Sequence, residues 1–245
     1  MGKERPTAFR RAQSAGREQR RVTLADSVED GSNPIVGSFW KGVDHPSLCP
    51  NDRVPEIAFA GRSNSGKSST LNRIAGSTRL ARVGKSPGRT QMINLFNSPE
   101  GVRLVDLPGY GYARVARTRQ EEWFKSINQY LTTRSNLAGV VLTMDIRRPL
   151  LVQDLHLIRW AAESSLPVLA LLNKSDKLGR GRALAQKAGV EQALSTLVSV
   201  EVELFSASKA IGVDRARCWV RERVKGVQEL ANKLDESPQD TRRGQ

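Results

Sequence analysis

Residues 61–68 read GRSNSGKS, and they stand between a short apolar segment and a segment with helical character. They match the pattern G-x-x-x-x-G-K-[ST], in which glycines let backbone N–H groups converge on a phosphate at a helix N-terminus. Lys67 is placed to reach the β- and γ-phosphates, and Ser68 to offer a hydroxyl to Mg²⁺. Because the motif needs a strand before it and a helix after it, it favours an α/β fold around a nucleotide phosphate site.

Apolar segments of strand length alternate with segments of helical periodicity along most of the chain. We expect strands at 56–60, 91–97, 102–107, 139–145, 168–173 and 200–206, and helices at 68–76, around 123–131, and at 151–163, 182–198 and 213–234. Two of the strands, 139–145 and 168–173, are almost continuously apolar, which is typical of parallel strands covered on both faces. The Pro-Glu-Gly turn at 99–101 predicts a hairpin. We therefore predict a three-layer α/β fold, with a mostly parallel six-stranded sheet, one antiparallel hairpin strand and helices on both faces.

Composition divides the chain of 245 residues into three parts. Residues 1–34 are polar and rich in arginine, so we expect a basic, disordered arm, with an organelle-targeting segment as the alternative. Residues 35–234 are expected to form the nucleotide-binding domain and 235–245 a polar tail. No apolar run has the length of a bilayer span, so we expect no membrane segment. Cys49 and Cys218 form no CxxC pattern, which predicts free thiols in a reducing compartment, the cytoplasm.

Two later motifs point to the base of the nucleotide. NKSD (173–176) follows an apolar strand, and the Asp176 carboxylate is placed to accept from both N1–H and the exocyclic amine of guanine. Adenine offers no such pair of donors. Asn173 is expected to bond the base edge or tie loops together, and the stem of Lys174 to cover the base face. In FSASK (205–209) the N–H of Ala207 is placed to meet guanine O6.

Two further segments have the character of switches that sense the terminal phosphate. In DLPG (106–109), Asp106 is placed to hold Mg²⁺ through a water, and the Gly109 N–H to donate to the γ-phosphate. In KSPGRTQ (85–91), Thr90 is the expected Mg²⁺ ligand of the triphosphate state, with Ser86 as the competing candidate. The residue after DLPG is Tyr110, where many small GTPases carry a water-orienting glutamine.

A phenol cannot orient water as a carboxamide does, so we expect slow hydrolysis that does not depend on Tyr110. Replacing this residue should leave basal turnover within about tenfold. Charge compensation must then come from elsewhere, and Arg89 and Arg114 are candidates.

The motifs GRSNSGKSS, KSPGRTQ, DLPGYGYA, NKSDK and FSASK, in this order, closely resemble the EngB/YihA (YsxC) family of bacterial ribosome-biogenesis GTPases. The resemblance covers roughly residues 35–233 and implies a single GTPase domain of the TRAFAC class. It implies binding of GTP and GDP with Mg²⁺, and assistance in assembling the large ribosomal subunit. Asn64 falls where potassium-using relatives of the same class carry an asparagine ligand, so the resemblance also suggests K⁺ as a source of charge compensation, with a loop-stabilising role for the Asn64 amide as the alternative. The N-terminal arm is longer than the family pattern, so the resemblance says nothing about its role.

The resemblance and the motifs together nominate the residues of the site. Lys67, Thr90 and Gly109 are the candidates for catalysis, and Ser68, Thr90 and Asp106 are the candidates for holding the metal. The nucleotide contacts are expected from Gly61, Arg62, Ser63, Asn64, Ser65, Gly66, Lys67, Ser68, Ser69, Gly88, Arg89, Thr90, Asp106, Leu107, Pro108, Gly109, Asn173, Lys174, Ser175, Asp176, Phe205, Ser206, Ala207 and Ser208.

The net charge of +14 is unevenly distributed, which bears on the partner. Residues 62–119 hold eleven Lys and Arg against two acidic residues, and seven of the basic residues flank or occupy the switch segments: Arg79, Arg82, Lys85, Arg89, Arg114, Arg117 and Arg119. We therefore expect a monomer that binds the rRNA of a large-subunit precursor in a nucleotide-dependent way. The alternatives are an RNA-binding protein with a mainly structural nucleotide site, and a GTPase of another process such as tRNA modification or cell division.

Overall fold

The computed structural model describes residues 33–81, 92–110, 117–197 and 199–236, all within the unit Gly31–Gln245. The strands are β1 (Ser38–Val43), β2 (Glu56–Gly61), β3 (Ile93–Asn97), β4 (Arg103–Asp106), β5 (Leu137–Asp145), β6 (Val168–Asn173) and β7 (Val200–Leu204). The helices are α1 (Lys67–Ile74), α2 (Arg117–Thr133), α3 (Val152–Glu163), α4 (Arg180–Ala193) and α5 (Val213–Glu236), with 3-10 turns η2 (Pro46–Leu48) and η3 (Ser175–Lys177). Among these residues, no helix is long and apolar enough to cross a bilayer.

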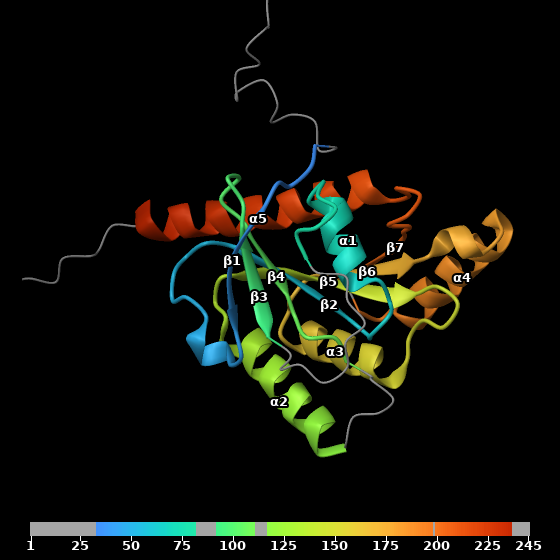
Figure 1. The fold of residues 1–245 in the computed structure, drawn as a ribbon, viewed down its shortest axis with the longest axis horizontal. Helices are drawn as coiled ribbons and strands as arrows, with labels where there is room; N and C mark the ends of the chain where they lie inside the picture. Colours follow the sequence, from blue (N-terminus) through green and yellow to red (C-terminus); the bar gives the residue numbers. More distant parts are fainter. Residues whose placement is uncertain (1–32, 82–91, 111–116, 198, 237–245) are drawn as a thin grey trace, which may run out of the picture. The chain divides into compact units, whose positions relative to one another are not determined.

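The strands form one sheet in the order β1-β3-β4-β2-β5-β6-β7 (Figure 1). Strand β3 runs antiparallel to β1 and β4, and the other neighbouring pairs are parallel. The predicted fold class is confirmed, but the predicted count of six strands was wrong. Strand β1 was missed because SFWKGV lacks regular alternation: it lies at the sheet edge, leaves Phe39 and Trp40 exposed, and shifts register between Phe39 and Lys41.

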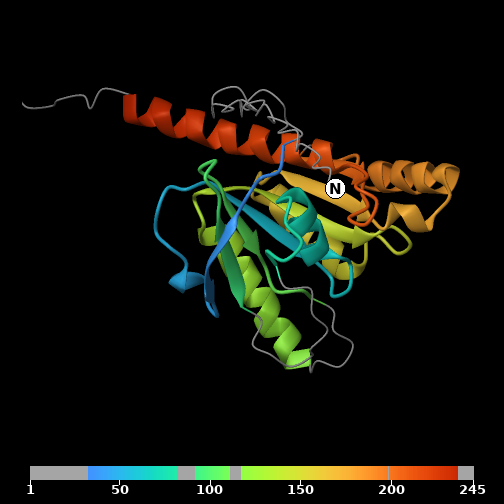
Figure 2. The same cartoon turned by 45° about the horizontal axis from the view of Figure 1, so that its top comes forward.

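Helices cover both faces of the sheet, as Figures 1 and 2 show. Side chains of α1 and α5 share one apolar core with residues of β2 and β5, and Trp219 at its centre is fully buried. Trp219 fits there because Gly139 has no side chain: a Cβ at Gly139 would lie 2.7 Å from the indole. Side chains of α2, α3 and α4 share the second core on the opposite face. The fourth helix ends at Ala193, earlier than predicted, because Ser195 and Thr196, which favour turns over helix interiors, follow its C-cap.

The parallel strands bring the polar motifs to one edge of the sheet. Strands β2, β4, β5 and β6 run in the same direction, so the loops that follow them all leave from their carboxyl ends. This edge therefore gathers the phosphate loop, DLPG, Asp145 and NKSD, and it is where open α/β sheets bind ligands.

A buried ionic cluster lies at the other end of β2. The fully buried Glu56 carboxylate accepts from Arg103 at 2.9 Å, from Arg134 at 2.7 Å and from the Tyr130 hydroxyl at 2.6 Å. Arg103 also donates to Asp52 at 2.8 Å. Burial next to this carboxylate raises the pKa of Tyr130 well above its ordinary value, so the phenol stays a donor. The cluster joins β2 and β4 to the C-terminal end of α2.

Candidate functional site

The loop between β2 and α1 curls because its residues accept unusual backbone angles. Gly66, with φ of 99°, is the N-cap of α1, and a Cβ there would collide with the Asn173 side chain. Gly61 passes so close to β5 that a Cβ would lie 2.6 Å from the Thr143 carbonyl oxygen. Asn64 adopts φ of 67°, a conformation that asparagine tolerates better than most residues. The loop thus leaves N–H groups at the start of α1 for an anion, as the sequence motif predicts.

The lysine of this loop pairs with the aspartate of DLPG. Lys67 Nζ forms an ion pair with the Asp106 carboxylate, and both side chains are about 10% exposed. Gly109 of DLPG also lies close to the phosphate loop, since a Cβ at Gly109 would lie 3.4 Å from Ser63 Oγ. The hydroxyls of Ser63 and Ser65 are buried and make no hydrogen bond to any residue that the structure describes. The centre of the loop therefore holds cationic and hydroxyl groups whose natural partner is a phosphate oxygen.

Asn173 ties three loops of this edge together. Its Nδ2 donates to the Ser65 carbonyl at 2.8 Å, and its Oδ1 accepts from the Ala207 N–H at 3.3 Å. Of the two roles expected for Asn173, the structure displays the loop-tying one.

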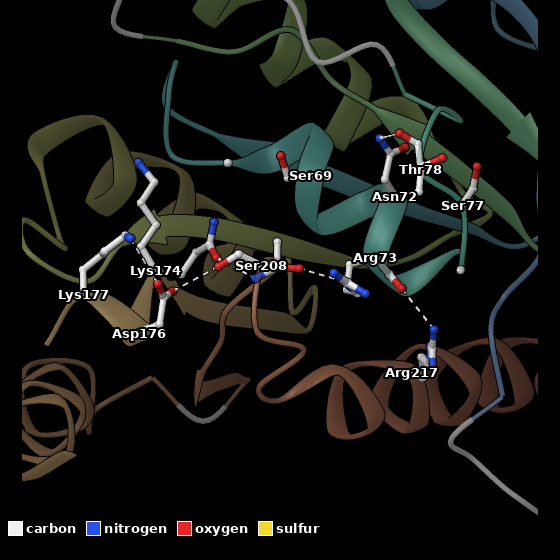
Figure 3. A pocket seen from close by; sticks show the side chains of 14 residues that line it. Ser69, Asn72, Arg73, Ser77, Thr78, Lys174, Asp176, Lys177, Ser208 and Arg217 are labelled. Atoms are coloured by element: carbon white, nitrogen blue, oxygen red, sulfur yellow. Dashed lines mark hydrogen bonds and ion pairs between the residues drawn. The ribbon is translucent and has the colours of Figure 1, made fainter. Parts of the chain in front are cut away.

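Asp176 stands beside these ties and is oriented by hydroxyls. Its Oδ1 accepts from Ser206 Oγ at 2.6 Å, and this hydrogen bond holds the pKa of the Asp176 carboxyl below its ordinary value. The carboxylate is therefore ionised; its Oδ2 pairs with the exposed Lys177 at 3.4 Å, and the side chain lines a cavity of about 490 Å³. Figure 3 shows Asp176, Lys174 and Ser208 on one side of this cavity and Ser69 and Arg73 of α1 on the other. A cavity of this size, with an acceptor aimed into it, suits a purine nucleoside.

Two arginines that the sequence motifs do not include hold the walls of this cavity (Figure 3). Arg73 Nε donates to the Ala207 carbonyl at 2.7 Å, which fixes the FSASK loop to α1. Arg217 of α5 donates to the Ile74 and Arg73 carbonyls, both at 3.0 Å, and so caps the last turn of α1. Their partners are backbone carbonyls distant in sequence, so no sequence motif could have identified them.

The Tyr110 side chain is buried and bonded to α3. Its ring is 3% exposed, and its hydroxyl donates to Asp154 of α3, which also accepts from the Leu151 N–H at 3.0 Å. Its carbonyl accepts from the Ser63 N–H at 2.7 Å. Burial raises the pKa of Tyr110 well above its ordinary value. The residue therefore joins the phosphate loop to the start of α3, and its phenol is placed for packing instead of water activation.

The structure thus brings together three of the four predicted groups: the phosphate loop, DLPG, and the paired motifs NKSD and FSASK. Phe205 is fully buried, and its carbonyl accepts from the Ser175 N–H at 3.0 Å. Phe205 therefore links FSASK to NKSD and lies in the core beneath both motifs. The fourth group, Gly88, Arg89 and Thr90 with the rival Ser86, lies outside the described residues. The side chains of Arg82, Lys85, Arg114, Arg117 and Arg119 also lie outside the description, whereas Arg79 is exposed.

Comparison with known proteins agrees with this arrangement. A family model described as "50S ribosome-binding GTPase" matches residues 56–174. A probable GTP-binding protein EngB of Colwellia psychrerythraea is 49% identical over 168 residues, which cover 68% of this chain and 75% of that protein. The corresponding protein of Salmonella paratyphi B is 51% identical over 169 residues, covering 69% and 80%.

Solved structures share the fold. A crystal structure of a probable GTP-binding protein engB aligns with a TM-score of 0.58 at 24% identity, over 70% of this chain and 99% of that one. A variant of Aquifex aeolicus Era, bound to GDP and aluminium fluoride, aligns with a TM-score of 0.52 at 21% identity, over 71% and 57%. The sequence likeness extends far beyond the phosphate loop, and the chain therefore belongs to the EngB family of GTP-binding proteins, which are GTPases.

Proposed function

We propose that this GTPase is an assembly factor for the large ribosomal subunit, and that GTP and GDP switch its affinity for rRNA-containing precursors. The observation that carries the proposal is the match of residues 56–174 to a family described by its binding to the 50S ribosome. The basic surplus of residues 62–119 supports it, because cations near the phosphate-sensing segments would couple RNA contacts to nucleotide state.

The described residues fit a magnesium nucleotide. The Ser68 hydroxyl and the Asp106 carboxylate are hard oxygen donors near the phosphate loop, of the kind that Mg²⁺ prefers, and would hold the ion. A bound Mg²⁺ neutralises charge on the phosphate oxygens. Lys67, which pairs with Asp106 in this structure, would exchange that partner for the β- and γ-phosphates. The Gly109 N–H would donate to the γ-phosphate, and Asp176 would read guanine.

A monovalent cation is a second part of the proposal. Asn64 exposes its side chain while its carbonyl accepts from Lys174 Nζ at 2.6 Å, so the amide is free to face the phosphates. With Tyr110 turned inward, K⁺ held by Asn64 would supply charge compensation in the transition state. Basal GTP hydrolysis should then rise in K⁺ relative to Na⁺ at equal ionic strength, and Asn64→Ala should remove the difference. Equal rates of the unmodified protein in both salts would refute this part.

Sedimentation tests the switch. Protein loaded with a non-hydrolysable GTP analogue or with GDP is pelleted with purified large-subunit precursors at two salt concentrations. We expect tighter association in the triphosphate state and weaker association at high salt, and equal binding in both nucleotide states would refute a switch. Depletion of the protein in cells should cause large-subunit precursors to accumulate on a gradient, and a normal gradient profile would count against an assembly role.

A further inference from the structure

A second cavity, of about 460 Å³, lies beside the nucleotide cavity and shares Lys174 with it. One wall is the phosphate loop from Arg62 to Ser65, and the other is the loop between β5 and α3, including Arg147 and Arg148. The lining contains four cationic side chains and two carboxylates, Asp145 and Asp154. Asp176, the residue expected to read guanine, lines the first cavity and not this one, which leaves the charge of the second cavity to be explained.

Both carboxylates already have partners. Asp145 accepts from Arg147 at 2.6 Å and from Lys174 at 2.9 Å, and these contacts hold the pKa of its carboxyl far below the ordinary value. Asp154 accepts from Tyr110 and is 2% exposed. The exposed Arg148 guanidinium, by contrast, makes no hydrogen bond or ion pair with any residue in the described part of the chain. The cavity therefore offers uncompensated positive charge to an anion.

The loop that carries the arginines is constrained by its own backbone. Asp145 Oδ1 accepts from the Arg147 N–H at 3.1 Å, and the Asp145 carbonyl accepts from the Arg148 N–H at 2.9 Å. Pro149 follows, and Leu150 adopts φ of 55°, which is unusual for a branched residue. A constrained backbone presents guanidinium groups at lower entropic cost than a flexible one, and the planar guanidinium fork matches phosphate oxygens.

We propose that this cavity is an RNA phosphate-binding site and that Arg148 is its principal contact. The inference rests on the proposed function, because it names the surface through which RNA would be bound. A protein partner is less well suited, since its interface would need an apolar core, whereas Met144 and Leu151 are the only apolar side chains in the described lining of this cavity. RNA backbone needs only closely spaced cations on an accessible surface.

The cavity is connected to the nucleotide site at two points. Lys174, whose stem is expected to cover the guanine base, donates both to Asn64 of the phosphate loop and to Asp145. Tyr110, directly after the γ-phosphate-sensing Gly109, binds Ser63 through its carbonyl and Asp154 through its hydroxyl. Both walls are thus attached to elements that would contact GTP. RNA bound in this cavity would act on the nucleotide site through these contacts, and any such coupling acts equally in both directions.

Fluorescence anisotropy with a labelled single-stranded RNA of about 16 nucleotides tests the site. Arg148→Ala should weaken binding about fourfold at about 0.15 M salt, and should lower the slope of log K against log salt by about 0.7, as for one lost phosphate contact. Lys225→Ala is the control for net charge: Lys225 on α5 is 77% exposed, its ion pair with Glu229 is exposed and 3.8 Å long, and its loss changes the net charge equally. We expect the control to keep the slope of the unmodified protein.

The outcomes separate this site from the proposed function. Equal RNA affinity and slope for Arg148→Ala and Lys225→Ala, or no RNA binding by the unmodified protein at low salt, would overturn the site. A loss of GTP affinity in Arg148→Ala would also overturn it, because the cavity would then belong to the nucleotide site. Failure of the assembly role would appear instead as absent precursor binding by the unmodified protein. Weakened precursor binding by Arg148→Ala, with GTP affinity unchanged, would support both.

Discussion

Tyr110→Phe is expected to cost stability without costing catalysis. The substitution keeps the aromatic ring in its core but removes the hydroxyl that donates to Asp154. Asp154 is 2% exposed, and among the described residues the Leu151 N–H is then its only remaining hydrogen-bond donor. Leaving a buried acceptor short of a partner costs about 1–3 kcal/mol. We therefore expect the free energy of unfolding to fall by about 2 kcal/mol, and the melting temperature by about 4–8 °C.

Basal hydrolysis in the same variant should stay within about tenfold of the unmodified protein, because no group that orients water is lost. Urea unfolding measures the first effect, and single-turnover phosphate release measures the second. The less conservative Tyr110→Ala is a poorer test than the sequence suggested, since truncating a buried aromatic opens a cavity that costs about 3–5 kcal/mol. A collapse of turnover, with GTP affinity and the unfolding curve unchanged, would refute the argument.

Tyr130→Phe is the matched control. It also removes a buried hydroxyl, which donates to Glu56 at 2.6 Å, but it lies in the ionic cluster at the opposite end of β2. It should lower stability to a similar extent and leave hydrolysis unchanged.

A double-mutant cycle between Tyr110→Phe and Asp154→Ala should give a coupling energy of about 1–3 kcal/mol. A coupling near zero would show that the two side chains do not act as a pair.

Three further changes test other parts of the structure. Asp176→Asn should weaken GDP binding at least about a hundredfold and favour xanthosine diphosphate, because the oxygen at C2 of xanthine can accept from the new amide. Unchanged GDP affinity by calorimetry would exclude Asp176 as the residue that recognises guanine. Gly66→Ala should abolish binding of fluorescent GDP, because Gly66 has a left-handed φ of 99° and a Cβ there would collide with the Asn173 side chain. Circular dichroism should show that the fold persists, and retained GDP binding would contradict the expected crowding. Glu56→Gln should lower the free energy of unfolding, measured in urea, by about 3 kcal/mol, since Arg103 and Arg134 lose the carboxylate that they share. A loss below about 1 kcal/mol would show that Asp52 and solvent compensate the two arginines for that carboxylate.

The site motifs could be predicted from the sequence because their chemistry is local. The phosphate loop needs glycines at fixed spacing, and NKSD follows directly on its strand, so both can be recognised without tertiary information. Strands β5 and β6 were also found, since burial on both faces makes them almost continuously apolar.

Features that depend on distant contacts were not predictable. Strand β1 is defined by its pairing with β3, and its own residues give no alternating pattern. Arg73 and Arg217 hold backbone carbonyls, which any residue can supply. The partner of Tyr110 is 44 positions away in the sequence, and no rule of spacing indicates it. Such contacts arise only when segments distant in the sequence pack together in three dimensions.

Strand β2 has opposite properties at its two ends. It begins at Glu56, where ion pairs and hydrogen bonds fix three side chains, and it ends at Gly61, where the backbone leaves the sheet toward the phosphate site. We therefore expect amide hydrogens near its start to exchange slowly, while exchange in the loop beyond Gly61 depends on what is bound there. Nucleotide binding is consequently expected to order the short loop after Gly61, while the start of β2 at Glu56 is held in place without a ligand.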